Sequence, residues 1–333
     1  MNSQLKKRPF KSILANPMNE FLRAKRALGK RFENEEKVLR LLDCYLIEQL
    51  IETIQDITPE LIDSFLASRP RNSSKSYNNL LGVLRRLFDW LKLHKLFCDS
   101  PVHTPPREAT ARKIPFIFNG PQVQQLLEAA SQLPNRPTAP DRGATYRMVF
   151  ALLYALGLRV GEISRLQIQD VDFQRNLLII RDTKFSKTRL VPFGPRVRSA
   201  LWDYLQQQTA RYGILALKQP IFSFSRVKAR PIYTNTISWT FHQLIAGLGL
   251  CIPPGVSSPH LHCLRHSFAV GTLLHWYRSG IDPACRLIHL STFMGHVSPS
   301  STAVYLTITM ELLQQVNQRF EKFAIPILRE VNR

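Results

Sequence analysis

Six residues in five separated segments have the types and the order needed to break and remake a phosphodiester bond without a metal ion. Such a reaction needs a nucleophile, cations that stabilise the non-bridging oxygens, a proton acceptor and a proton donor. Tyr305 is the candidate nucleophile, and it stands nine residues beyond His296. Two guanidinium groups, one ammonium group and another imidazole precede them, in the order Arg159, Lys184, His262 and Arg265.

Most of these candidates fall at a predicted helix end or in a turn, where a side chain can meet a substrate. Arg159 lies between two predicted helices, in the string Gly-Leu-Arg-Val-Gly-Glu. Lys184 lies in the turn of a predicted hairpin, and Lys187 follows on the same turn, so either ammonium group could reach a phosphate. His262 and Arg265 open a helix, whose N-terminal amides would themselves attract phosphate.

The same residues also have ordinary structural interpretations. A single arginine after a helix usually caps carbonyls, and a single tyrosine usually packs in a core. The joint order and spacing of the five segments favour the catalytic interpretation. Glu162 and Asp170, near the first segment, are interpreted as holding arginines or capping helices, and His266 as packing or hydrogen-bonding at the start of its helix.

A metal site is the competing use of the histidines. His260, His262 and His266 lie close to Cys263 along the chain. However, the glutamate of an HExxH motif is missing between His262 and His266, and no second ligand pair stands at zinc-finger spacing. No metal is therefore expected.

The five segments resemble the motifs of the tyrosine recombinase or phage integrase family, especially its compact Xer-like members. The family pattern has a Gly-Leu-Arg string followed by Glu, a hairpin lysine before Arg-Leu-Val-Pro, a His-x-Leu-Arg-His string, a Leu-Gly-His string and then a tyrosine. The matching strings here are 157–162, 184–192, 262–266, 294–296 and residue 305. Met294 replaces the usual leucine, which keeps an apolar side chain of similar volume. The resemblance covers roughly 114–320.

The resemblance implies that Tyr305 attacks the scissile phosphate and leaves a 3′-phosphotyrosyl link and a free 5′-hydroxyl. A phenol with an ordinary pKa near ~10 needs cationic surroundings and a base to do this at neutral pH. Arg159 and Arg265 would clamp the non-bridging oxygens, because a planar guanidinium can hold phosphate through two hydrogen bonds.

The remaining implied roles concern protons. Lys184 would protonate the departing 5′-oxygen, with Lys187 as a backbone contact. His262 would accept or share the tyrosine proton, and His296 would hydrogen-bond the phosphate. Because the phosphotyrosine keeps the bond energy, neither ATP nor any other cofactor is implied, and the sequence has no GxxxxGK[ST] phosphate loop.

The charge of the chain predicts a polyanionic partner. Among its 333 residues, 45 are Lys or Arg and 24 are Asp or Glu, which gives a formal net charge of +21. Residues 1–112 hold 20 basic and 13 acidic residues, so the excess is not confined to one tail. Double-stranded DNA fits, since each neutralised phosphate releases counterions. A membrane partner is not expected, because the sequence shows neither an apolar span nor a basic amphipathic anchor.

Five scattered cysteines without a CxxC pair predict reduced thiols and a cytoplasmic protein. The resemblance to DNA recombinases implies association with the bacterial nucleoid. The expected fold class is mainly α with a small antiparallel β-sheet, in two domains that form a DNA clamp. The expected parts are a basic N-terminal extension (1–15), a helical core-binding domain (16–98), a proline-rich linker (99–113) and a catalytic domain (114–325).

Hydrophobic periodicity and capping residues place the elements. Helices are expected at 16–29, 34–51 (capped by Asn34), 58–65 and 72–91, and then after 119–121 and at 146–156, 162–166, 197–208, 234–248, 264–277, 285–293 and 309–323. The strands 177–180 and 189–192 form the expected hairpin.

The expected function is site-specific recombination, such as integration, excision or transposition, by a tetramer on two DNA sites. The amphipathic helix 309–323 would dock into a neighbouring protomer, and sister recombinases are a possible further partner. Two alternatives stay open: strand cleavage like that of a type IB topoisomerase, and a catalytically silent DNA-binding relative. The short N-terminal extension leaves no room for a further arm-binding domain.

Overall fold

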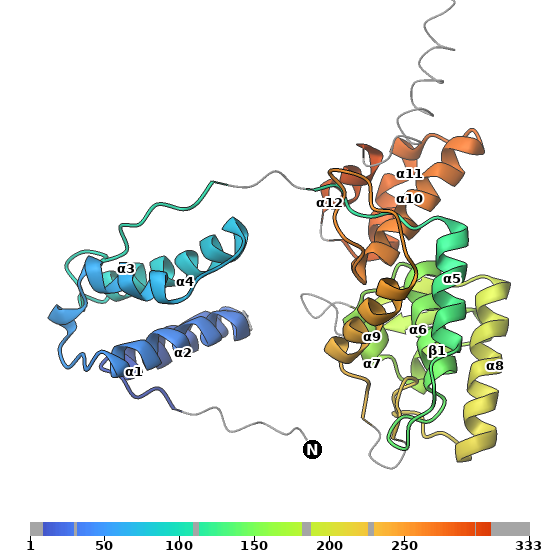
Figure 1. The fold of residues 1–333 in the computed structure, drawn as a ribbon, viewed down its shortest axis with the longest axis horizontal. Helices are drawn as coiled ribbons and strands as arrows, with labels where there is room; N and C mark the ends of the chain where they lie inside the picture. Colours follow the sequence, from blue (N-terminus) through green and yellow to red (C-terminus); the bar gives the residue numbers. More distant parts are fainter. Residues whose placement is uncertain are drawn as a thin grey trace, which may run out of the picture. The chain divides into compact units, whose positions relative to one another are not determined.

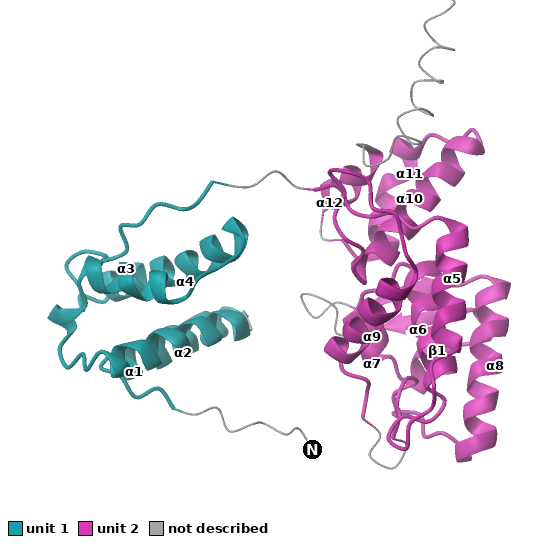
Figure 2. Ribbon diagram, in the orientation of Figure 1, with its two compact units in different colours: residues 1–112 teal, residues 113–333 magenta. Residues whose placement is uncertain are grey.

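A computed structural model of the chain describes residues 9–29, 32–108, 113–181, 188–225, 230–296 and 298–307. It divides into two units, residues 1–112 and 113–333, which are coloured separately in Figure 2. The finer residue limits expected for the parts of the chain, including those of the N-terminal extension and the linker, stay predictions. None of the helices in the described part is long and apolar enough to cross a membrane.

The described residues of unit 1 form four α-helices, which are labelled in Figure 1. They are α1 (Ala15–Ala27), α2 (Glu33–Glu48), α3 (Pro59–Ser68) and α4 (Ser74–Leu93), with a 3-10 turn η1 at Ile54–Asp56. Thr58 and Ser73 cap α3 and α4, because their side-chain oxygens accept hydrogen bonds from the first turn. One face of α4 supplies eight buried residues to the core, from Tyr77 to Leu91.

The start of α2 differs from the expectation. Phe32, not Asn34, is the N-cap, with a left-handed φ of 51° and no side-chain cap. Its ring packs edge-on against Phe21, with centroids 5.9 Å apart. The prediction of an Asn34 cap was wrong because packing of Phe32 in the core sets the point where the helix begins.

Unit 2 is a helical unit with one small sheet, so the expected fold class is confirmed. Its helices are α5 (Gly120–Ser131), α6 (Arg142–Ala155), α7 (Val160–Arg165), α8 (Pro195–Tyr212), α9 (Thr234–Gly247), α10 (His262–Arg278), α11 (Pro283–Met294) and α12 (Ser300–Ala303). The described part of unit 2 also has two 3-10 turns, η2 (Ile168–Asp170) and η3 (Val304–Thr307).

The sheet is antiparallel in the order β1-β2-β3. Strands β2 (Leu177–Ile180) and β3 (Arg189–Pro192) are the expected hairpin, with Leu178 opposite Val191. The third strand, β1 (Val171–Asp172), was not expected, because two residues are too few to carry an alternating pattern. The expected hairpin turn lies outside the described residues.

Helix α6 runs through the centre of unit 2, where nine of its residues are buried. It packs closely on α5: a Cβ added to Gly143 would lie 2.3 Å from the carbonyl oxygen of Ser131. A second apolar cluster joins α10, α11 and η3, and it includes Tyr305, whose residue is only 4% exposed. This cluster fixes the position of the predicted nucleophile.

Candidate active site

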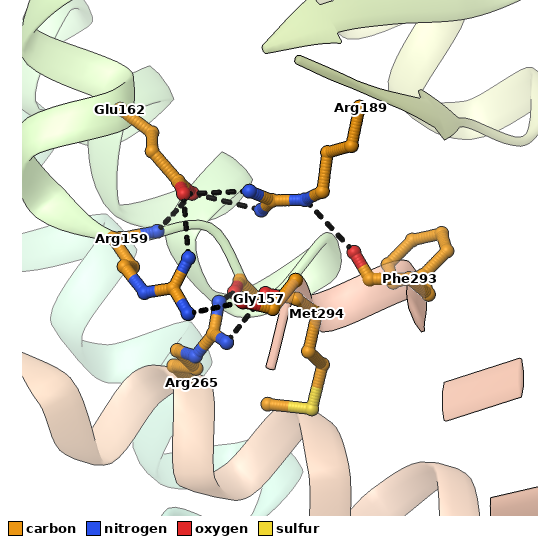
Figure 3. Close-up of polar contacts among 8 residues, drawn as sticks. Gly157, Arg159, Glu162, Arg189, Arg265, Phe293 and Met294 are labelled. Carbon is orange, nitrogen blue, oxygen red and sulfur yellow. Dashed lines mark hydrogen bonds and ion pairs between the residues drawn. The ribbon is translucent and has the colours of Figure 1, made fainter. Parts of the chain in front are cut away.

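The carboxylate of Glu162 organises the arginines of the site (Figure 3). It lies in the first turn of α7, where it accepts a hydrogen bond of 2.8 Å from the backbone amide of Arg159. The Arg159 guanidinium donates to the same carboxylate, also at 2.8 Å. Arg189, on β3, donates both Nη groups to it at 2.6 and 2.8 Å. Glu162 therefore holds two guanidinium groups, as expected for it.

These contacts determine the charge of Glu162, whose side chain is 2% exposed. Burial alone would raise the pKa of this carboxyl group. The hydrogen bonds and positive charges of Arg189 and Arg159 outweigh burial and lower the pKa to about 2. The carboxylate is thus ionised at neutral pH and compensates part of the positive charge of the site.

Arg265 is buried on α10 and lies at the centre of this network. Its two Nη groups donate to the carbonyl oxygens of Gly157, at 2.5 Å, and Met294, at 2.6 Å. Burial, and then the nearby charge of Arg159, lower its pKa to about 9. Its Nε has no hydrogen-bond partner among the described residues. The guanidinium group therefore stays positive at pH 7 and is fixed between two chain segments.

Two glycines, Gly157 and Gly295, supply backbone carbonyl oxygens that accept hydrogen bonds from the arginines. Gly157 has a φ of +57°, and an added Cβ would lie 2.5 Å from the ring of Phe268. Gly295 has a φ of +66°, and its carbonyl oxygen accepts a hydrogen bond of 2.7 Å from Arg159. Only glycine adopts such backbone readily in close contact with a neighbour.

The hydroxyl of Tyr305 meets an imidazole from α10. Nδ1 of His266 lies 2.8 Å from Tyr305 Oη, and the two rings are 5.4 Å apart. Burial raises the pKa of Tyr305, although the charges of Arg265 and Arg159 act in the opposite direction. The sequence interpretation made His262 the partner of the tyrosine and had His266 packing or hydrogen-bonding at the start of its helix; in the structure the hydrogen bond to the tyrosine comes from His266.

His262 and His296 lie beside this pair. The His262 ring stands edge-on to His266 with centroids 4.6 Å apart, and the His296 ring lies 6.4 Å from that of Tyr305. His296 Nδ1 is 2.6 Å from the hydroxyl of Thr302. Desolvation, together with nearby cations, lowers the pKa of both imidazoles, so both are neutral at pH 7.

Five of the six predicted residues meet in this site: Arg159, His262, Arg265, His296 and Tyr305. The sixth, Lys184, lies outside the described residues, as do Lys187 and the expected docking helix 309–323. In the described part of the chain no group of three His, Cys, Asp or Glu residues could hold a metal ion.

Sequence reasoning missed two residues that hold the site together. Arg189 opens the Arg-Leu-Val-Pro string, and its Nε also donates to the carbonyl oxygen of Phe293, at 3.0 Å. That string could have singled it out, since an arginine on a strand whose side chain is largely buried, 11% exposed here, needs an acidic partner. Thr302, which is fully buried, contacts His296. No sequence signal marks it.

Comparison with known proteins defines the class. The model of the phage integrase family matches residues 118–311. The chain is 33% identical to a putative integrase/recombinase y4rB of Sinorhizobium fredii, over 93% of this chain and 98% of that protein. It is also 33% identical to the tyrosine recombinase XerC of Lacticaseibacillus casei, over 72% and 74% of the two chains. The chain belongs to the phage integrase family of tyrosine recombinases, as its motifs predicted.

Solved structures share the fold at low sequence identity. The Tn1549 transposon integrase in complex with transposon right end DNA has a TM-score of 0.60 at 16% identity, over 92% of this chain and 99% of that chain. A lambda integrase dimer bound to a core site has a TM-score of 0.59 at 17% identity, over 86% and 76% of the two chains.

Proposed function

We propose that the chain is a site-specific DNA recombinase that cuts and rejoins DNA through a covalent bond between Tyr305 and a 3′-phosphate. The observation that carries this proposal is that Tyr305 packs against α10, the helix that holds the fixed Arg265 guanidinium, and that its hydroxyl lies 2.8 Å from Nδ1 of His266, the residue after Arg265. The charges of Arg159 and Arg265 both act on Tyr305. Membership of the phage integrase family and the net charge of +21 support it.

The arginines supply what a metal ion supplies in other phosphoryl-transfer sites. When Tyr305 Oη attacks the phosphorus atom, negative charge develops on the two non-bridging oxygens. Arg159 and Arg265 would stabilise this charge, and their guanidinium groups are already held by Glu162 and by backbone carbonyls. Such preorganised donors lose little free energy to reorientation during the reaction.

The other groups handle protons and orientation. Lys184 protonates the 5′-oxygen as its bond to phosphorus breaks. His296, neutral and held by Thr302 through Nδ1, can donate a hydrogen bond to a phosphate oxygen through Nε2. His262 precedes Arg265 on the first turn of α10 and contributes a second neutral imidazole beside the phosphate.

Complete recombination joins two DNA sites, so we propose that four copies of the chain assemble on a pair of sites. The helix expected at 309–323 would link neighbouring copies, and sister recombinases are a further candidate partner. Double-stranded DNA in the bacterial cytoplasm is the proposed substrate. Affinity should fall steeply with salt, because binding through phosphates releases counterions.

Covalent trapping tests the proposal. The probe is a nicked duplex that carries the site selected by the protein from a random-sequence DNA pool. After the protein cuts near the nick, the short fragment diffuses away and the adduct accumulates. A denaturing gel should show a shifted band with the natural chain and none with Tyr305→Phe. No adduct on a duplex that the protein demonstrably binds would instead leave a silent DNA-binding relative.

The topoisomerase alternative is tested with supercoiled plasmids. A recombinase should produce recombinant products only when the plasmid carries two copies of the selected site. Efficient relaxation of a plasmid that lacks the site, without recombinant products, would favour the topoisomerase activity.

A further inference from the structure

The hydrogen bond between Tyr305 and His266 joins the proposed nucleophile to a histidine with no role in the proposal so far. It connects η3 to α10 across 39 residues of sequence, at 2.8 Å. Tyr305 is 4% exposed, so few water molecules can compete for its hydroxyl. A buried phenol and an imidazole at this distance have the geometry of an acid and its base.

The neighbouring imidazoles are directed to other contacts in the described structure. His296 Nδ1 is occupied by the Thr302 hydroxyl at 2.6 Å. His262 has its ring edge-on to His266, not to Tyr305. His266 is thus the imidazole that reaches the tyrosine hydroxyl among the described residues.

The protonation state of His266 suits an acceptor. Burial, followed by the charges of His260 and Arg265, lowers its pKa to about 4. The ring is therefore neutral at pH 7. In the tautomer that serves as acceptor, Nδ1 is unprotonated and receives the hydrogen of the phenol, and Nε2 carries the ring hydrogen.

We propose that His266 is the proton acceptor for Tyr305 during strand cleavage and returns that proton during strand joining. This inference rests on the proposed recombinase function. As the bond between Oη and phosphorus forms, the phenol proton passes to Nδ1 of His266. The bond between phosphorus and the 5′-oxygen breaks, and that oxygen receives a proton from Lys184. In joining, both proton transfers reverse, so no external acid, base or cofactor is consumed.

Substrate binding strengthens this base. In the free protein, burial disfavours protonation of His266, as do His260 and the positive charge of Arg265. A bound phosphate adds negative charge next to the same arginine and so favours the protonated imidazole. Tyr305, on η3, also becomes more acidic as its oxygen bonds to phosphorus. Proton transfer is therefore coupled to bond formation with DNA and does not occur in the free protein.

The test replaces the base without removing the hydrogen bond. In His266→Asn, the amide occupies the position of Nδ1 and can hold the hydroxyl, but it cannot take up a proton. Cleavage of the nicked duplex described above should slow by about 10²- to 10⁴-fold. The matched control is His275→Asn, which changes an exposed histidine near the other end of the same helix, α10, and should cleave at the natural rate. DNA binding and thermal unfolding are measured for every variant.

A more acidic nucleophile separates a catalytic role from a structural one. With 3,5-difluorotyrosine at position 305, the phenol needs less help from a base. This replacement should restore cleavage by His266→Asn at least about tenfold more than it changes cleavage by the natural chain. If His266→Asn does not fold, His266→Gln is used, because its amide also fills the space of the ring without being basic.

Three outcomes are distinguishable. A slow His266→Asn that the fluorinated phenol rescues supports the inference. Natural rates in His266→Asn, or equal effects of fluorination in both backgrounds, overturn it and leave the recombinase function intact. Absence of any adduct with the natural chain overturns the recombinase function, and the inference with it.

Discussion

Replacing Glu162 with glutamine should lower the free energy of unfolding of unit 2 by about 3 kcal/mol at pH 7. The carboxylate accepts four hydrogen bonds, from Arg189, from the Arg159 side chain and from the Arg159 amide. The change in pKa, from 4.5 to about 2, corresponds to about 3.4 kcal/mol in favour of the ionised form. Glutamine also turns an NH₂ group toward donors, which leaves buried groups without partners.

The pH dependence follows from the sign of the shift. Because folding lowers the pKa of Glu162, its contribution is fully present above pH 4.5 and is lost as the pH falls through about 2. At pH 3 the remaining contribution is about 1.4 kcal/mol. The difference in stability between the natural chain and Glu162→Gln should therefore shrink by about 2 kcal/mol between pH 7 and pH 3.

Urea unfolding followed by tryptophan fluorescence measures this difference. Three of the four tryptophans lie in unit 2, so a Trp90→Phe background reports on that unit alone. The control is Asp170→Asn, which also removes a buried capping carboxylate. The Arg181 side chain that pairs with Asp170 is half exposed, so water can replace the ion pair. Asp170→Asn should therefore lower the free energy of unfolding by about 1 kcal/mol. A Glu162→Gln variant as stable as Asp170→Asn, or a difference independent of pH, would refute the reasoning.

Three further perturbations test other parts of the site and fold. Gly157→Ala should destabilise unit 2 by about 2–4 kcal/mol in urea unfolding, since it adds a clash with a ring to the backbone strain. Gly249→Ala, at a φ of +58° in open space, should show the strain alone, about 1–2 kcal/mol; equal losses would contradict this. Thr302→Val should slow DNA cleavage without weakening DNA binding, because it frees the His296 ring, and Thr302→Ser should recover the rate. Asn119→Ala should cost about 1 kcal/mol by removing the cap of α5, and no loss would show that the cap is dispensable.

The local elements were predictable because their causes are local. Thr58 and Ser73 begin α3 and α4 through hydrogen bonds to residues three positions away. The short apolar run Leu177–Ile180 and the segment Arg189–Pro192, separated by a polar stretch, identify the hairpin. The start of α2 was not predictable in this way, since Phe32 is held in a left-handed conformation by contact with Phe21.

Residue types and their order along the chain define the chemistry available to this protein. The types and order of Arg159, Arg265, His296 and Tyr305 define the family, and the excess of basic residues indicates a polyanionic substrate. These conclusions need no geometry, because a motif is a property of residue identity and spacing.

Which side chains of the site contact one another depends on the tertiary structure. Arg159 binds the carbonyl oxygen of Gly295 across 136 residues, a contact that no spacing rule contains. His262 and His266 lie one turn apart on α10, and either could have faced the nucleophile. The packing of η3 against α10 brings Tyr305 to His266. A hydrogen bond depends on a fraction of an ångström, and that precision arises from packing between distant segments.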